Sequence, residues 1–168
     1  DANWNPLYRL LAVIAAYYQS GKFMKGISGH FDSIGLNYYR YTKFGDTEIY
    51  PTTDMGWKVN PEKIELALKY LSRYKKPIYI SEAGVADDTD SLRVDYIKRQ
   101  VQGVWNAIQS GVDVRGHMYW SLLDNYELAL GYDKRFGLIE VDYETLERKI
   151  RPSAYVYKEI CEKNAVIE

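Results

Sequence analysis

The chain has 168 residues, a formal net charge of −1 and 46% hydrophobic residues, which is enough for one domain with a hydrophobic core. The near-neutral charge gives no electrostatic basis for binding nucleic acid or an anionic membrane surface. The single cysteine, Cys161, excludes an intrachain disulfide framework, and with only two histidines a zinc site is not expected.

The first residue is Asp1, and neither an initiating Met nor the charged and apolar regions of a secretory signal precede the first elements. The apolar run from Leu10 to Tyr18 is too short for a membrane-spanning helix, which needs about 20 residues. We therefore expect a cytoplasmic protein in which Asp1 is a cut inside a longer chain. Residues 1–168 are interpreted as a single domain.

A helix is predicted to begin at Asn5-Pro6, because an N-cap residue is followed there by Pro at the first helical position. Apolar residues recur at helical spacing as far as Tyr18, and Gly21 stands where a helix commonly ends. This helix is apolar over most of its circumference, so we expect it to need partners on more than one side.

The first strand is predicted at Phe31 to Tyr39, and a loop follows from Arg40 to Val59. Asn60-Pro61 opens a second helix, which Pro77 is expected to end. Ile78-Tyr79-Ile80 is a short apolar run between Pro77 and Gly84, which is typical of a buried strand in a parallel sheet. It leads to the carboxylate of Glu82. Taken alone, this stretch also fits an acid that caps the next helix or pairs with an arginine.

A third helix is predicted from about Ser91 to Ser110, and a third strand from Val114 to Trp120. A long loop then leads to a hairpin, Phe136–Asp142 with Arg148–Ile150, and Pro152 opens a last helix. The apolar residues that we expect to form the buried stripe of the third helix are Val94, Ile97, Val101, Val104 and Ile108.

Two sets of polar residues are interpreted as structural. Asp87, Asp88 and Asp90 lack the Gly and the distal Glu of a calcium loop, so we expect solvated or helix-capping acids. His30 and His117 flank predicted strands and have no second ligand at metal-binding spacing. The alternation of helices and strands predicts an α/β fold with about three parallel strands joined by crossover helices.

Three segments together resemble glycoside hydrolase family 1, the family of β-glucosidases and β-galactosidases. They are Gly35-Leu36-Asn37-Tyr38-Tyr39, Tyr79-Ile80-Ser81-Glu82-Ala83-Gly84 and Tyr119-Trp120-Ser121-Leu122-Leu123-Asp124-Asn125-Tyr126-Glu127. Further segments that carry the resemblance are Met55-Gly56-Trp57, Gly131-Tyr132, Arg135-Phe136-Gly137 and Arg151-Pro152-Ser153-Ala154. The resemblance covers nearly the whole chain and corresponds to the C-terminal portion of a (β/α)8 TIM barrel.

The resemblance implies a retaining β-glycosidase, in which one carboxylate attacks the sugar and a second serves as acid and base. Glu82 would be the nucleophile, and Tyr39 would hold it by a hydrogen bond. Substrate-binding roles would fall to Asn37, Trp120, Glu127, Phe136 and Trp57, with Trp120 as the floor under the sugar and Trp57 facing the leaving group. The alternative for Tyr39 and Trp120 is packing in the core. The alternative for Glu127 is a loop carboxylate exposed to water. No cofactor or metal is implied.

The family's acid/base segment, which is similar to Thr-Asn-Glu-Pro, has no counterpart in this sequence. We therefore expect the chain to act on a small β-glycoside or oligosaccharide only when an N-terminal half of the barrel completes it, or when it self-associates. The alternative is a non-catalytic sugar-binding or scaffold half-barrel. Ser81, Ala83, Lys58 and Leu128 depart from the family's usual residues, Leu128 standing where a Trp is usual after Glu127.

Overall fold

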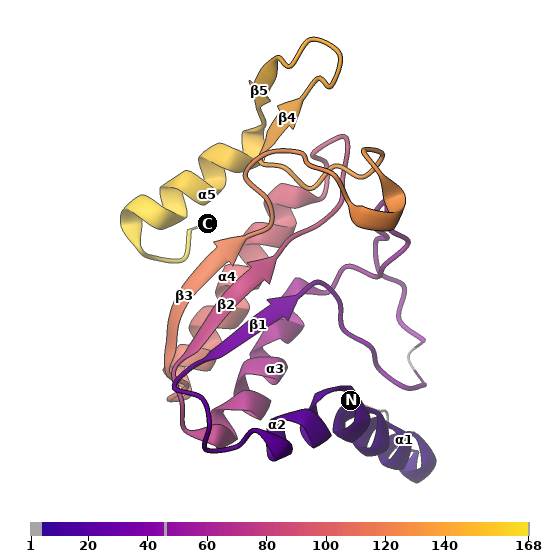
Figure 1. Ribbon diagram of the computed structural model, residues 1–168, viewed down its shortest axis with the longest axis vertical. Helices are drawn as coiled ribbons and strands as arrows, with labels where there is room; N and C mark the ends of the chain where they lie inside the picture. The colour runs from indigo at the N-terminus through magenta and orange to yellow at the C-terminus, as the bar shows by residue number, and fades with distance from the viewer. Residues whose placement is uncertain (1–4, 46, 168) are drawn as a thin grey trace.

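A computed structural model describes residues 5–45 and 47–167. At its centre lies a parallel sheet of three strands, β1 (Ile34–Tyr38), β2 (Ile78–Ala83) and β3 (Val114–Tyr119), in the order β1-β2-β3 (Figure 1). Each strand lies where the sequence predicted one. The predicted α/β class with parallel strands is confirmed.

Helices cover one face of this sheet. The crossover helices are α3 (Ile64–Leu71) and α4 (Arg93–Gln109), and α5 (Pro152–Lys163) packs against α4. Figure 1 shows α3 and α4 behind the strands. The main core lies between the two layers and is made of Ile34, Leu68, Ile78, Ile80, Val104 and other buried apolar residues. A second core joins α4, α5 and the loops above the strands.

The opposite face of the sheet carries no helix among the described residues (Figure 1). Tyr79 and Met118 point to this open face and remain 39% and 47% exposed. Strands of a parallel sheet are normally covered on both faces, because crossover connections place helices there or the sheet closes into a barrel. The open face is therefore unusual for a parallel sheet and is available to contact further strands or helices.

A β-bulge in β2 decides which face Glu82 occupies. Ile80 pairs with Leu36 on one side and His117 on the other, but the next pairs are Glu82 with Asn37 and Ala83 with Tyr119. Ser81 is thus an extra residue relative to both neighbouring strands. Strict alternation from the buried Ile80 would turn Glu82 toward the helices. With the extra residue, Ala83 is buried there instead and Glu82 stays on the open face.

The N-terminal helix continues past its predicted end. α1 (Pro6–Ala16) runs through a π-helical turn (Tyr17–Gly21) into α2 (Lys22–Gly26), and Asn5 caps its start by accepting the Leu7 N–H at 2.9 Å. The prediction that Gly21 ends the helix was wrong. A Cβ at Gly21 would lie 3.1 Å from the Tyr70 hydroxyl, so the glycine allows close contact with α3.

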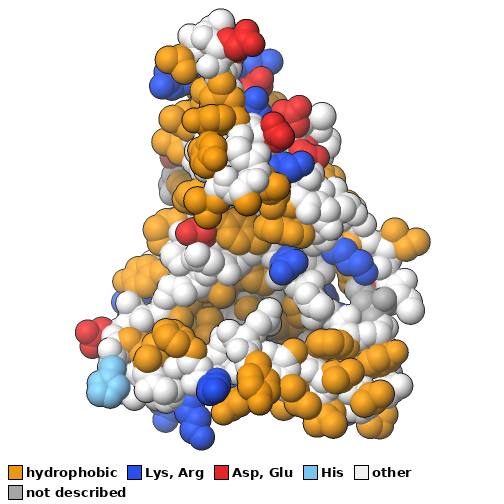
Figure 2. Space-filling model, turned by 45° about the vertical axis from the view of Figure 1, so that its right-hand side comes forward, with side chains coloured by type: hydrophobic (Ala, Val, Ile, Leu, Met, Phe, Trp, Pro, Cys, Tyr) orange, Lys and Arg blue, Asp and Glu red, His pale blue; other side chains and the backbone are white. Residues whose placement is uncertain are grey.

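None of the residues of α1 is buried. Its large apolar side chains, together with those of the following turn and α2, are 38–71% exposed. They form what we call the α1 apolar surface: Leu7, Leu10, Leu11, Val13, Ile14, Tyr17, Tyr18 and Phe23. Figure 2 shows these hydrophobic side chains gathered at the lower right of the molecule. The expected partners of this helix are therefore not within the described chain.

Two other helices differ from expectation. The helix after Asn60 begins and ends with 3₁₀ turns, Pro61–Lys63 and Ser72–Tyr74, and ends before Pro77 because Lys75 adopts a left-handed backbone with φ of 52°. In α4, Ile97 and Val104 are buried as predicted, but Ile108 is 40% exposed. The buried face of α4 is shifted, and its other members are Arg93, Tyr96, Gln100, Gly103 and Ala107.

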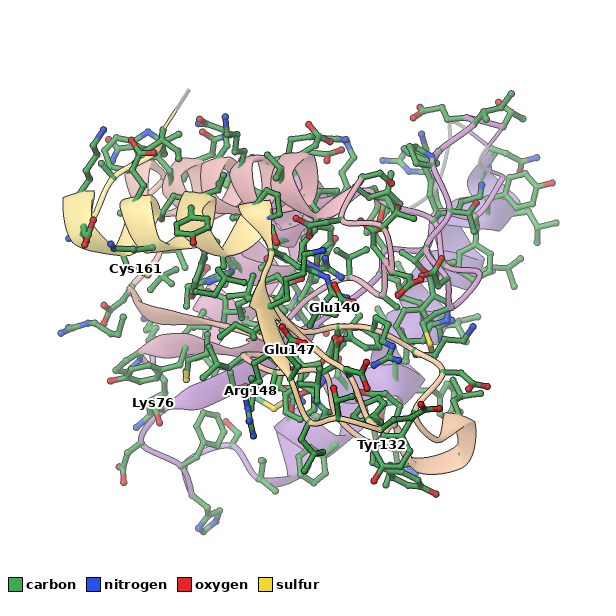
Figure 3. The ribbon with its side chains drawn as sticks, turned by 90° about the horizontal axis from the view of Figure 1, so that it is seen from above. Lys76, Tyr132, Glu140, Glu147, Arg148 and Cys161 are labelled. Carbon is green, nitrogen blue, oxygen red and sulfur yellow. The ribbon has the colours of Figure 1, made fainter. Side chains whose placement is uncertain are left out.

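The predicted hairpin is present as antiparallel β4 (Ile139–Val141) and β5 (Arg148–Ile150). Figure 3 shows Glu147 and Arg148 on this hairpin and Cys161 on α5. In the preceding loop, Leu128–Leu130 forms a short 3₁₀ turn. Within residues 5–45 and 47–167, no helix has both the length and the apolar character that spanning a membrane requires.

Candidate active site

The carboxyl ends of β1 and β2 bring Tyr39 and Glu82 together. Tyr39 directly follows β1, and Glu82 is near the end of β2. The Tyr39 hydroxyl donates a hydrogen bond to Glu82 Oε2 at 2.6 Å. A phenol that donates to a carboxylate favours its ionised form and fixes its orientation. The pair therefore presents a positioned carboxylate at the edge of the open sheet face.

Aromatic rings surround the phenol of Tyr39. The ring centroids of Trp57 and Phe136 each lie 6.0 Å from that of Tyr39 in edge-to-face contacts, and Phe136 is only 2% exposed. Burial raises the pKa of Tyr39 well above its ordinary value, and the hydrogen bond to Glu82 and the nearby charges of Glu82 and Glu127 raise it further. Tyr39 therefore stays neutral and remains a donor at any physiological pH.

Asn37 lies beside this pair on the open face. Its Cα is opposite that of Glu82, and its Oδ1 accepts a hydrogen bond from the Ser81 hydroxyl at 2.8 Å. This hydrogen bond orients the amide plane of Asn37, whose N–H₂ group can donate to a ligand. The bulged residue, Ser81, thus orients a predicted site residue, although the motifs assigned no role to Ser81 itself.

Trp120 and Glu127 form a second pair. The Trp120 indole N–H donates to Glu127 Oε1 at 3.1 Å, and both side chains are half-buried. Trp120 is held close to the end of β2, because a Cβ at Gly84 would lie 1.9 Å from the Trp120 carbonyl oxygen. The charge of Glu127 also raises the pKa of Tyr39, although burial and Glu82 contribute more.

A buried ion pair supports Phe136 and the loop that carries Glu127. Asp124 is 4% exposed, and its Oδ1 accepts from Arg151 Nη1 at 3.1 Å and from the Gly137 N–H at 2.8 Å. Asp124 and Arg151 lie within the motifs quoted above, but nothing in their spacing indicated that they pair. Removing either would leave an uncompensated buried charge beneath the site.

The acids before α4 have structural roles. Asp87 accepts hydrogen bonds from the backbone N–H groups of Leu92 and Arg93, and Asp90 forms an ion pair with the fully buried Arg93. Helix capping is confirmed, although Asp87 is buried rather than solvated. His117 is also a structural residue, because its ring nitrogens lie 3.0 Å from Gln100 Oε1 and 3.1 Å from the Tyr157 hydroxyl.

Tyr39 is the residue on which the predicted site converges. It contacts Glu82, Trp57 and Phe136, and Asn37 lies next to Glu82. The predicted residues that form the neighbouring pair are Trp120 and Glu127. Among the described residues, no three His, Cys, Asp or Glu side chains are grouped as metal ligands would be. The arrangement can hold a carboxylate against a sugar, with an aromatic platform and a hydrogen-bonding acid beside it.

A family model, related sequences and solved structures all match this chain to the same group of proteins. A model of glycosyl hydrolase family 1 matches residues 11–166. The chain is 40% identical over 164 residues to a beta-galactosidase of Saccharolobus solfataricus, with 84% of this chain and 34% of that protein covered. It is 36% identical over 194 residues to a 1,4-beta-D-glucan glucohydrolase of Thermotoga neapolitana, with 98% and 44% covered.

Among solved structures, a beta-glycosidase from Pyrococcus horikoshii superposes with a TM-score of 0.90 at 36% identity, over 99% of this chain and 46% of that one. A crystal structure of hyperthermophilic beta-glucosidase from Pyrococcus furiosus gives a TM-score of 0.88 at 34% identity, over 99% and 40%. The chain thus spans less than half the length of these relatives.

Proposed function

This chain belongs to glycosyl hydrolase family 1, and from that membership we propose that it supplies the nucleophile half of the active site of a retaining β-glycosidase. Its three parallel strands and their helices are a portion of a (β/α)8 barrel. In such barrels the chemistry takes place at the carboxyl ends of the strands, which is where Glu82 and Tyr39 meet.

The observation that carries the proposal is the 2.6 Å hydrogen bond between Tyr39 and Glu82 on the open sheet face. Glu82 would attack the anomeric carbon of a β-glycoside, forming a covalent glycosyl-enzyme bond as the leaving group departs. Water would then hydrolyse that bond and release the sugar with retained configuration. The Tyr39 phenol would hold the attacking carboxylate in position in the first step, and would itself stay protonated because its own pKa is raised.

The substrate contacts follow from the same geometry. Glu127, fixed by the Trp120 indole, keeps a carboxylate oxygen available to accept hydrogen bonds from sugar hydroxyls. The Trp120 ring would support the apolar face of the sugar, and the Asn37 amide would donate to it. Phe136 and Trp57 would complete the wall around Tyr39.

A second carboxyl group, the acid/base, must come from outside these residues in this proposal. Retaining enzymes place their two carboxyl groups about 5–5.5 Å apart. Of the other acids at the site, Asp124 is paired with Arg151 in a buried ion pair, and Glu127 is assigned to the sugar hydroxyls in this proposal. We infer that an N-terminal half of the barrel supplies the acid/base and covers the open sheet face and the α1 apolar surface.

The test is complementation. The purified chain would be mixed with a separately expressed N-terminal half taken from a family member, and release of nitrophenol from an aryl β-glucoside would be followed. We expect hydrolysis only in the mixture, because general acid–base catalysis is typically worth about 10²–10⁴ in rate. Glu82→Gln should reduce the rate roughly 10³-fold or more, since the whole covalent route depends on the nucleophile.

Glu147→Gln is the matched control, because Glu147 lies on the β4–β5 hairpin and should leave the rate unchanged (Figure 3). The nucleophile proposal is wrong if the wild-type chain and its Glu82→Gln variant both form a complex that binds glucose equally well, yet neither complex hydrolyses the glycoside. The chain would then be a sugar-binding half-barrel, an alternative favoured by Leu128, which is 86% exposed beside Glu127.

A further inference from the structure

A cavity of about 210 Å³ lies in the loop between β1 and α3, next to the candidate active site. Three cationic side chains, Arg40, Lys43 and Lys58, line it together with Trp57, and none of the described residues that line it is acidic. We call it the basic cavity. The chain as a whole has a formal net charge of −1, so this concentration of positive charge is local and not a property of the entire surface.

The basic cavity is linked to Glu82 by aromatic contacts. Trp57, one of its walls, has its ring centroid 6.0 Å from that of Tyr39, whose hydroxyl is bonded to Glu82. The Arg40 guanidinium lies 5.5 Å from the centroid of Trp57, and both residues line the cavity. Trp57 therefore joins the basic cavity to Tyr39, the residue that contacts Glu82.

The cations of the cavity differ in how far they are neutralised. Lys43 forms an ion pair with Glu48 at 3.4 Å, and Glu48 is 59% exposed at its side chain. The Lys58 amine contacts the Glu48 carbonyl oxygen at 3.5 Å and lies 5.5 Å from the ring centroid of Tyr50. Arg40, in contrast, forms no ion pair with any residue in the described ranges 5–45 and 47–167. Its planar fork, held 5.5 Å from the ring centroid of Trp57, is suited to receive a carboxylate.

We propose that the basic cavity binds the leaving-group portion of the β-glycoside and selects an aromatic leaving group that bears a carboxylate. Trp57 would stack on the aromatic ring and Arg40 would pair with the carboxylate. The size is suitable for a single substituted ring, because a cavity of about 150 Å³ already holds benzene. This inference rests on the proposed function, since it extends the substrate of the Glu82 site.

The experiment compares two ligands that differ only in charge, 4-carboxyphenyl β-D-glucopyranoside and its methyl ester. Each would be titrated into the purified chain, and into a complex of the Glu82→Gln chain with an N-terminal half, which should not consume the ligand, with binding followed by the indole N–H resonance of Trp57 in NMR spectra. We expect the acid to bind about threefold to tenfold more tightly than the ester, as one partly exposed charge pair contributes. Raising the salt from about 20 mM to about 500 mM should remove most of this preference.

Arg40→Gln keeps a polar side chain at this exposed position and should abolish the preference for the acid. Arg148→Gln is the matched control, because Arg148 lies on the β4–β5 hairpin, apart from the loop that forms the cavity, and should preserve the preference (Figure 3). Equal affinity for acid and ester in the wild-type chain would overturn the inference. A preference that survives in Arg40→Gln would overturn it as well.

Hydrolysis by the completed barrel separates this inference from the function on which it rests. If both glycosides are hydrolysed with the same kcat/KM, the basic cavity does not select a carboxylate, while the role of Glu82 stands. If neither is hydrolysed but the acid is preferred in an Arg40-dependent manner, the cavity binds as inferred and the role of Glu82 is wrong.

Discussion

The hydrogen bond from Tyr39 to Glu82 connects residues that are 43 positions apart in the sequence. A hydrogen bond to a charged group contributes about 1.5–3 kcal/mol, so Tyr39→Phe should lower kcat/KM of the completed enzyme roughly 10- to 100-fold. Tyr155→Phe, on the exposed face of α5, is the matched control and should have no effect. Equal activity of both variants would mean that the phenol does not assist the carboxylate.

His117 predicts how stability depends on pH. Burial lowers the pKa of His117 from 6.5 to about 4, so the unfolded chain takes up a proton near pH 6.5 and the folded protein only near pH 4. The contribution of His117 to the free energy of unfolding is thus fully present above pH 6.5 and is lost as the pH falls toward 4. The free energy of unfolding then decreases by at most about 1.4 kcal/mol per pH unit. Thermal midpoints measured across this range should fall less steeply in His117→Gln. Parallel curves for the two proteins would contradict the prediction.

At the scale of the elements, the contact between the end of β2 and the end of β3 has no spare room. A Cβ at Gly84 would lie 1.9 Å from the Trp120 carbonyl oxygen and 3.0 Å from its carbonyl carbon, which are backbone atoms. Gly84→Ala should therefore force the strand ends apart and lower the free energy of unfolding by about 3 kcal/mol, the upper part of the usual range for overpacking. Urea unfolding measures this change.

Gly26→Ala is the control for that variant, because a Cβ there meets no atom within 4 Å. It should leave the unfolding midpoint nearly unchanged. If Gly84→Ala unfolds at the same urea concentration as Gly26→Ala, the two strand ends are not in close contact.

The elements also show which parts of the structure the sequence could predict. β2 was predictable because its short apolar run stands between Pro77 and Gly84, and Glu82 and Tyr39 were placed by motifs at strand ends. The buried face of α4 was only partly predictable, since Arg93 and Gln100 are buried by virtue of hydrogen bonds that hydrophobic periodicity does not report. Likewise, Gly21 looked like a helix end, but its role depends on Tyr70, a distant residue.

The β-bulge at Ser81 was not predictable either. Bulges depend on how two neighbouring strands pair, and the sequence of one strand carries no direct signal for that pairing. The arrangement of Asn37 next to Ser81 was missed for the same reason. The motifs predicted which residues are candidates for the site. Only the pairing of the strands in the structure revealed on which side of the sheet these residues lie.

At the scale of the whole molecule, the α1 apolar surface should govern association. Leu10 is 56% exposed on α1. Leu10→Glu retains a good helix former but places a charge where the N-terminal half is proposed to pack, so we expect it to weaken binding of that half by more than about tenfold. Native mass spectrometry or titration calorimetry measures the affinity.

Leu146→Glu is the corresponding control, because Leu146 is 61% exposed on the turn of the distant hairpin. It should bind the N-terminal half as the wild-type chain does. Equal weakening in both variants, or none in either, would show that α1 is not part of the proposed interface.

The extra residue in β2 makes the length of this strand less critical than its pairing. A chain lacking Ser81 would place Glu82 directly after the buried Ile80, so ordinary alternation would keep the carboxylate on the open face and Ala83 among the helices. The shorter strand would lose only the Ser81 hydroxyl that donates to Asn37. In the opposite case, a strand that retained Ser81 but paired without the bulge would turn its carboxylate toward the helices and an alanine methyl group toward the open side. The pairing of β2 with its neighbours, and not its number of residues, thus sets the side on which the proposed nucleophile lies.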